Sequence, residues 1–326
     1  MCQANNNKYV DFCIIKFFKM VRLKINKLAI FKLLFLLIMA TLISSCSMSS
    51  TFHHPSKMPK LEKVEYLSFS INNDSMRVKY NKDNNQISFF DKNNDTINKS
   101  YTIKSEYFIS KNGNKLNGWM LSPKNIKPIA TILQFHGSGG NLIFHHNIIA
   151  PLVEQGFQIY IFDYSGYGVS EGKATRKNIE IDAYSAFENF ITKPKIQGTK
   201  IVLYGQSYGG YLAAVVGAEN QDKIDAMVIE SGFTSHKSEA AYTVPIIGYM
   251  VKNGKTTTTK IIREYKKPLL IIHSIEDKRT PYRMAEKIYN NANEPKELFK
   301  IKKGHLEALK YYSEDIGIKI KNMIAE

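Results

Sequence analysis

One serine in the sequence has neighbours that suit a nucleophile. The run KIVLYG (200–205) predicts a buried strand, and it leads directly into GQSYGG (205–210) and then into the helix-like stretch YLAAVVGAE. A serine between glycines at such a strand-to-helix turn is exposed on a sharp bend, because bulky side chains two positions away would clash. The N–H groups at the helix start can also stabilise negative charge. The pattern therefore predicts Ser207 as a nucleophile.

A serine hydroxyl needs a base to take its proton, and the base needs a carboxylate to orient it. The chain order that accompanies this type of turn is serine, acid, histidine. Downstream, Asp277 follows the apolar run PLLIIH (268–273), and His305 follows KELFKI (296–301). Both residues fall in loops after strand carboxyl ends, the edge at which open α/β sheets build their sites. They are the candidates for acid and base.

A glycine-rich loop, HGSGGN (136–141), follows another apolar run, IATILQF. Such a loop lets backbone N–H groups approach the oxygen of a reacting carbonyl. We expect the N–H groups of Ser138 and Tyr208 to form an oxyanion hole.

Other titratable residues near these motifs receive structural interpretations. We interpret Asp163, in DYSGYG, as a carboxylate that holds neighbouring loops, and His136 as a residue that shapes the glycine-rich loop. His145 and His146 fall at the start of a predicted helix, where we expect both to lie at the surface. A position at the mouth of the site is the alternative. His273 is expected at a strand end beneath the loop of Asp277.

After residue 128, apolar β-branched runs alternate with helical stretches. This pattern predicts an α/β fold with a mainly parallel central sheet of about eight strands, covered by helices on both faces. The expected strands are 129–135, 157–162, 200–205, 226–231, 268–273 and 296–301, and the expected helices are 142–155, 178–192, 207–220, 281–291 and 305–325. Residues 236–266 interrupt the alternation and are predicted to form a small cap.

Taken together, the motifs resemble those of α/β-hydrolase-fold serine hydrolases, and most closely the α/β-hydrolase-domain subgroup that includes depalmitoylating thioesterases and serine-aminopeptidase-like proteins. The resemblance rests on HGSGGN (136–141), DYSGYGVSEG (163–172), GQSYGG (205–210), ESGFTS (230–235), IIHSIEDKRTP (271–281) and GH (304–305). It implies Ser207 as nucleophile, His305 as base and Asp277 as the carboxylate partner of His305.

Some positions leave alternatives open or depart from the family pattern. Glu230 is an alternative acid, because some α/β-hydrolases place the acid after that strand. Ser274 stands where a glycine is usual, and Leu306 and Glu307 follow the histidine of GH. Neither departure removes a member of the expected triad.

The segment before this region has a β-hairpin pattern. Short strand-like runs between residues 64 and 121 are separated by turns rich in asparagine, including the Asn-Gly turn at 112–113. We expect a β-hairpin extension over 61–110 and the hydrolase domain over 111–326.

The N-terminus has the order of a secretory signal. A basic stretch precedes an apolar run over 33–43 and the small residues Ser44 and Ser45. ISSC (43–46) resembles a bacterial lipobox, so we expect residues 1–46 to be a signal peptide that ends at a lipidated Cys46, with Met20 as a more natural start than Met1. An uncleaved membrane anchor is the alternative. Residues 47–60 are polar and are predicted to be a tether.

The composition and charge of the chain favour a folded protein that does not bind nucleic acid. The chain has 326 residues, 44% of them apolar, with a formal charge of +16, which fits a folded protein and not a disordered one. The positive charges are mixed along the chain instead of forming a stripe, so nucleic acid is not expected as a partner. All three cysteines lie within residues 1–46, so no disulfide is expected in the folded part.

These observations predict a monomeric, exported hydrolase, anchored in the bacterial cell envelope, that cleaves carboxylic ester or thioester bonds of a small-molecule or lipid substrate. The expected mechanism needs no metal and no organic cofactor. The alternatives are a serine peptidase, a lipase acting on membrane lipid, and a non-catalytic envelope lipoprotein.

Overall fold

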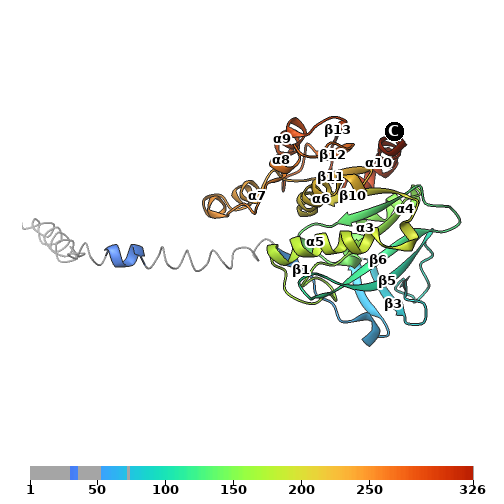
Figure 1. Ribbon diagram of the computed structural model, residues 1–326. Helices are drawn as coiled ribbons and strands as arrows, with labels where there is room; N and C mark the ends of the chain where they lie inside the picture. Colours follow the sequence, from blue (N-terminus) through green and yellow to red (C-terminus); the bar gives the residue numbers. More distant parts are fainter. Residues whose placement is uncertain (1–29, 36–52, 72–73, 326) are drawn as a thin grey trace, which may run out of the picture. The chain divides into compact units, whose positions relative to one another are not determined.

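The computed structural model describes residues 30–35, 53–71 and 74–325 (Figure 1). Residues 30–35 are helical and belong to a unit of their own, which ends at Ser47. Cys46 and most of the expected signal peptide lie outside the described residues. Where the structure is described, no helix is long and apolar enough to cross a membrane.

Apolar runs build the parallel part of the central sheet. Its strands, in spatial order, are β13 (Lys296–Ile301), β12 (Leu269–Ser274), β11 (Ala226–Glu230), β10 (Lys200–Gln206), β7 (Ala130–Phe135) and β9 (Gln158–Phe162). Each of the residues of β7 is buried, because helices cover both faces of the sheet. Successive side chains alternate between the faces, so that Leu133 and Ile132 enter different cores.

The N-terminal hairpins continue this same sheet. The added strands, which pair antiparallel, are β6 (Lys115–Pro123), β5 (Tyr101–Ile109), β4 (Gln86–Phe90), β3 (Asp74–Asn81) and β2 (Leu67–Ile71). The described residues therefore contain an eleven-stranded sheet, longer than the eight strands expected. The sheet is longer because the hairpin of β5 and β6 pairs with β9 on one side and with β4 on the other.

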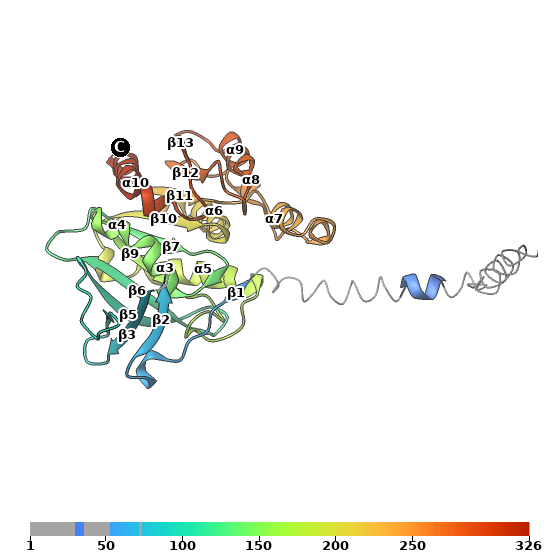
Figure 2. The same ribbon diagram turned by 180° about the vertical axis from the view of Figure 1, so that it is seen from behind.

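Helices pack on both faces of the sheet (Figures 1 and 2). One core includes residues of α5 (Arg176–Ile191), α6 (Tyr208–Glu219), α8 (Thr258–Ile261) and α9 (Tyr282–Asn291), and the other core includes residues of α3 (Leu142–Ile149), α4 (Pro151–Glu154) and α10 (Ala308–Ala325). The single helix expected over 142–155 was wrong. It is split because Pro151 has no N–H to continue α3, and it instead starts α4.

Short elements complete the fold. They are the 3₁₀ turns η1 (Leu61–Lys63), η2 (Pro194–Ile196), η3 (Gln221–Lys223) and η4 (Ile246–Met250), the helix α7 (His236–Thr243), and the two-residue strands β1 (His54–Pro55) and β8 (Gly139–Gly140). Helix α7 and η4 fall in the region expected to form a cap. Strand β1 falls within the expected tether but pairs in parallel with β8, so this part of the N-terminal segment is held on the fold.

Candidate active site

The turn between β10 and α6 holds Ser207 in a strained conformation. Its φ is 54° and its ψ is −113°, a region that residues with a Cβ rarely adopt. Two glycines permit the turn by close approach: a Cβ on Gly205 would overlap the carbonyl oxygen of Gly209, and one on Gly209 would overlap that of Phe135. The G-x-S-x-G spacing is thus required by backbone packing around the serine.

Ser207 lines a pocket of about 920 Å³, which it shares with Ser138 and His305. The predicted loops therefore converge on one cavity. Gly137 lies beside the serine, because a Cβ on Gly137 would be 3.7 Å from the Cβ of Ser207. The rest of the wall is formed by residues of the glycine-rich loop, of α3 and of the turn after His305, among them Phe144, Ile148, Pro151 and Leu306.

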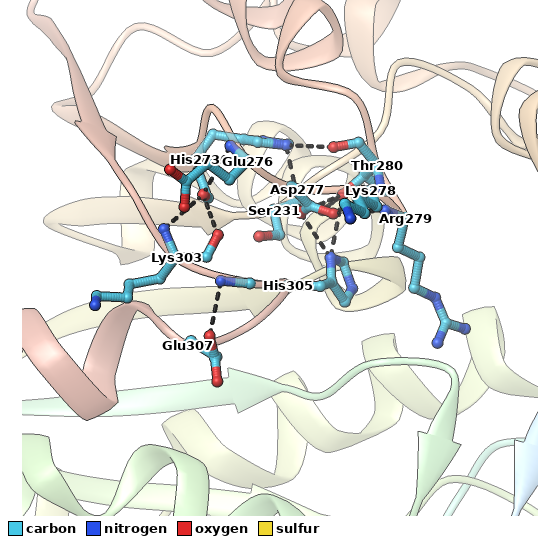
Figure 3. A network of polar contacts seen from close by, with 12 residues as sticks. Ser231, His273, Glu276, Asp277, Lys278, Arg279, Thr280, Lys303, His305 and Glu307 are labelled. Atoms are coloured by element: carbon cyan, nitrogen blue, oxygen red, sulfur yellow. Dashed lines mark hydrogen bonds and ion pairs between the residues drawn. The ribbon is translucent and has the colours of Figure 1, made fainter.

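The structure brings His305 and Asp277 into direct contact (Figure 3). The Nδ1–H of His305 donates to Asp277 Oδ2 at 2.7 Å, which leaves Nε2 for a partner on the other side of the ring. Burial alone would raise the pKa of Asp277, but the hydrogen bond and charge of His305, with the N–H groups of Thr280 and Arg279, more than offset burial and hold that pKa well below its usual range. Asp277 is therefore ionised and oriented toward the histidine.

Thr280 and Ser274 support this pair, although sequence reasoning assigned no role to Thr280. The hydroxyl of Thr280 lies 2.9 Å from Asp277 Oδ2 and 3.2 Å from His305 Nδ1. Ser274 joins the two loops, because its hydroxyl donates to the carbonyl of Lys303 and accepts from the N–H of Lys303 at 2.9 Å. The serine in place of the usual glycine therefore links the two loops that carry Asp277 and His305. The only sequence signal for Thr280 is its position three residues after Asp277.

Glu230, the alternative acid, forms hydrogen bonds with residues other than His305. Its Oε2 accepts from the hydroxyl of Tyr204 at 2.9 Å and from Nε2 of Gln206 at 2.7 Å. Burial raises the pKa of Glu230, although these two donors work against that rise. The geometry therefore pairs His305 with Asp277 and places Glu230 beneath the turn of Ser207.

The glycine-rich loop has its carbonyl groups turned toward the protein. Four consecutive carbonyl oxygens accept hydrogen bonds: His136 from Tyr164 Oη (2.9 Å), Gly137 from His136 Nδ1 (2.7 Å), Ser138 from Tyr167 Oη (2.7 Å) and from the N–H of His54 (2.8 Å), and Gly139 from His145 Nε2 (2.6 Å). In a trans peptide the N–H points away from the carbonyl of the same unit. The hydrogen bond to the carbonyl of Gly137 therefore constrains the direction of the Ser138 N–H.

The histidines around this loop are neutral. Burial lowers the pKa of His136 well below its usual range, with the neighbouring His145 as a second cause, and burial lowers the pKa of His145 to about 4. The surface positions expected for His145 and His146 were wrong, since both are buried. His146 bonds Tyr101 at 2.9 Å, and His145 also lines the pocket. Asp163 accepts the N–H of Leu142 at 2.9 Å, which ties two loops together as expected.

Comparison with known proteins decides the family. A model of the alpha/beta hydrolase fold matches residues 130–247. The uncharacterized protein YfhR of Escherichia coli O157:H7 is 33% identical over 214 residues, which cover 64% of this chain and 75% of YfhR. The chain belongs to the α/β-hydrolase family.

Solved structures show the same α/β-hydrolase fold. Est1E of Butyrivibrio proteoclasticus, solved with ferulic acid bound, has a TM-score of 0.59 at 20% identity and covers 68% of this chain and 100% of its own. An esterase of Pyrococcus furiosus has a TM-score of 0.58 at 19% identity and covers 69% of this chain and 93% of its own. In this α/β-hydrolase, the arrangement provides a serine on a strained turn, an imidazole whose Nδ1 is bonded to Asp277, and the Ser138 N–H beside a held carbonyl. Together these groups are suited to acyl transfer.

Proposed function

We propose that this protein is a serine hydrolase that cleaves carboxylic ester or thioester bonds. The observation that carries the proposal is the strained Ser207 in a pocket shared with His305, whose far nitrogen is bonded to an ionised Asp277. This is the arrangement in which a histidine activates a hydroxyl and a carboxylate fixes the histidine tautomer.

The proposed reaction follows from these groups. Ser207 Oγ attacks the acyl carbon while His305 Nε2 takes the hydroxyl proton. The N–H groups of Ser138 and Tyr208 hold the resulting oxyanion. The carbon–leaving group bond then breaks, and the leaving alcohol or thiol takes the proton from His305. A water molecule, deprotonated by His305, next attacks the acyl-enzyme. The bond between the acyl carbon and Ser207 Oγ breaks, and Oγ takes the proton back from His305, which releases the acid and restores Ser207.

The choice of ester or thioester rests on the pocket and the structural relatives. Apolar side chains of Phe144, Ile148, Pro151 and Leu306 line the wall beside Ser207 and suit an acyl chain. One structural neighbour is an esterase, and another was solved with ferulic acid bound. Both support an acyl substrate for this chain.

Hydrolysis of nitrophenyl esters of increasing acyl length tests this function. The wild-type full-length chain in detergent is expected to turn over these esters, with a rate that depends on acyl length because of the apolar wall. The variant Ser207→Ala removes the attacking oxygen and is expected to lose about 10⁴-fold or more of kcat/KM while it unfolds at the wild-type temperature. Full residual turnover in a folded Ser207→Ala protein would contradict the proposal.

We also propose that the enzyme is an exported lipoprotein anchored through Cys46. The support is the basic, apolar and small-residue order before that cysteine. Acyl chains on the cysteine would hold the protein on a membrane, since each buried CH₂ contributes roughly 0.8 kcal/mol. Cells fed an alkyne fatty acid are expected to label the wild type and not Cys46→Ser. Equal labelling of the two proteins would sink this part of the proposal.

A further inference from the structure

Residues 53–58, here called the N-terminal strap, lie against both loops that supply the proposed oxyanion donors. The N–H of His54 donates to the carbonyl of Ser138 at 2.8 Å, and the N–H of Ser56 donates to that of Gly140, also at 2.8 Å. The ring of His53 packs edge-on against that of Tyr208, with the ring centres 4.7 Å apart. One short segment therefore contacts Ser138 and Tyr208, the two donor residues.

The strap is also fixed from its other side. The N–H of Gly168 donates to the carbonyl of Ser56 at 3.1 Å, and the N–H of Met58 donates back to the carbonyl of Gly168 at 3.1 Å. Lys57 Nζ adds a bond to the carbonyl of Ser170 at 3.1 Å. The strap thus lies between the glycine-rich loop and the loop of residues 163–170, which itself supplies the Tyr167 hydroxyl to Ser138.

Different residues orient the two peptide groups that flank Ser138. The peptide before Ser138, which includes its N–H, is oriented by His136 through the carbonyl of Gly137. The peptide after Ser138 is oriented by Tyr167 and by the strap. The Ser138 N–H keeps one direction only if both of these peptides are held. Rotation about φ or ψ of Ser138 would otherwise reorient the loop.

His53 acts by packing and not by charge. It is buried, and burial, with the neighbouring charge of His54 as a smaller cause, lowers its pKa to about 4. Its Nδ1 has no hydrogen-bond partner within the described part of the chain. Tyr208 therefore contacts a neutral aromatic ring at this position. Because phenylalanine also supplies such a ring, we expect that it can replace His53.

We propose that the N-terminal strap is a positioning element of the active site, which sets the oxyanion hole by holding Ser138 and Tyr208. This inference rests on the proposed function. It means that the segment that follows the proposed anchor is part of the catalytic apparatus, because His53 comes only seven residues after Cys46. Cleavage or displacement of the strap would then lower catalysis with Ser207, His305 and Asp277 all in place.

Proline substitutions in the full-length chain test the strap through its backbone. His54→Pro removes the N–H that bonds Ser138. Lys60→Pro is the matched control, because Lys60 has a φ of −58°, which proline adopts, and donates none of the backbone bonds seen in the described chain. We expect His54→Pro to lower kcat about 10- to 100-fold with KM within about threefold, since an oxyanion hole acts on the transition state. Lys60→Pro is expected to behave as wild type.

A side-chain series gives a second and milder test. His53→Ala is expected to lower kcat about 10-fold, and His53→Phe to restore it to within about twofold. Inhibition by an aryl trifluoromethyl ketone, which forms an oxyanion on the serine, is expected to weaken in parallel with kcat. Folded His54→Pro and His53→Ala proteins that keep wild-type kcat would overturn the proposal, as would an equal loss in Lys60→Pro.

Hydrogen exchange separates this inference from the proposed function. In His54→Pro, the amides of residues 137–140 are expected to exchange faster than in wild type, whether or not the wild type hydrolyses any ester tested. Unchanged exchange there would show that the strap does not hold the loop. A wild type without Ser207-dependent turnover, but with faster exchange in the variant, would contradict the function and leave the strap in place.

Discussion

The ends of β11 and β12 lie side by side, and each leads to a buried carboxyl group, yet the pKa values of the two groups are shifted in opposite directions. Asp277, after β12, meets a histidine, a hydroxyl and two N–H groups, and its pKa is held well below the usual range. Glu230, at the end of β11, accepts hydrogen bonds from Tyr204 and Gln206, and burial outweighs these donors and raises its pKa. The partners of a carboxyl group, and not its position at a sheet edge, therefore determine how its pKa is shifted.

The opposite pKa shifts fit different tasks. An ionised Asp277 can stabilise the imidazolium that forms when His305 takes a proton. Glu230 lies in a chain of buried polar groups that also includes Gln134, whose Nε2 donates to Gln206 at 2.6 Å. This chain supports the backbone turn of Ser207, whose N–H donates to the carbonyl of Glu230 at 2.9 Å. We therefore expect substitutions at the two carboxyl groups to affect different quantities.

The largest effect is expected for Asp277→Asn. An amide cannot hold His305 in the tautomer that presents an unprotonated Nε2 to Ser207, so kcat is expected to fall about 10⁴-fold. Steady-state hydrolysis of a nitrophenyl ester measures this loss. If Glu230→Gln caused the larger loss and Asp277→Asn a small one, the roles given to the two carboxyl groups would be reversed.

A smaller effect is expected for Thr280→Val, which removes the hydroxyl that contacts both Asp277 and His305. Without it, the pair keeps its charge but loses orientation, and we expect kcat to fall about 10-fold. Thr280→Ser keeps the hydroxyl and serves as the control. Equal rates in the valine and serine variants would show that the hydroxyl does not position the pair.

The two carboxyl groups are also expected to give opposite dependence of stability on pH. The lowered pKa of Asp277 stabilises the fold above about pH 4, the ordinary value for an aspartate, and this gain is lost as the pH falls further. The raised pKa of Glu230 does the reverse: stability is lost as the pH rises above about 4.3, because the unfolded chain ionises first. Urea unfolding of wild type, Asp277→Asn and Glu230→Gln between pH 3 and 7 measures both differences.

In that experiment, the stability of wild type relative to Asp277→Asn is expected to shrink on acidification below pH 4. The stability of wild type relative to Glu230→Gln is expected to shrink as the pH rises. The same slope for both differences would contradict the assigned directions of the two pKa shifts.

The smallest effect is expected for Glu230→Gln on catalysis. Glutamine keeps the volume and one acceptor for Tyr204 or Gln206, so kcat/KM is expected to stay within about threefold of wild type. Comparison of kcat/KM at one neutral pH suffices. A loss of 100-fold or more in a folded protein would assign Glu230 a direct part in the reaction.

The sequence predicted much of this framework because its signals are local. Continuous apolar runs indicated the parallel strands, and the glycines around Ser207 indicated the strained turn, since both arise from residues close in the chain. The antiparallel part was predicted as hairpins but not as a continuation of the sheet, because it joins the parallel strands through the pairing of β6 with β9, which lies far along the chain. No pattern in the sequence specifies such a pairing.

The supporting contacts of the site were not predictable in the same way. Strand β1 has two residues, too few to show any periodicity. The residues near His54 were therefore predicted to be a tether. The hydroxyls of Tyr164 and Tyr167 bond the glycine-rich loop, and no local pattern in the sequence indicates these contacts because their partners are distant in the chain. His145 and His146 were predicted to be polar surface residues, because a sequence pattern does not reveal the distant residues that bury a neutral imidazole.

The central claim is that Ser207 is an activated nucleophile held by His305 and Asp277. Its most direct test is labelling of the full-length protein with a fluorophosphonate, followed by mass spectrometry of the modified peptide, in wild type, Ser207→Ala and Asp277→Asn. We predict a single adduct on Ser207 in wild type, none in Ser207→Ala, and labelling slowed by orders of magnitude in Asp277→Asn. A folded wild-type protein that takes no label, or takes it on another residue, would contradict the account.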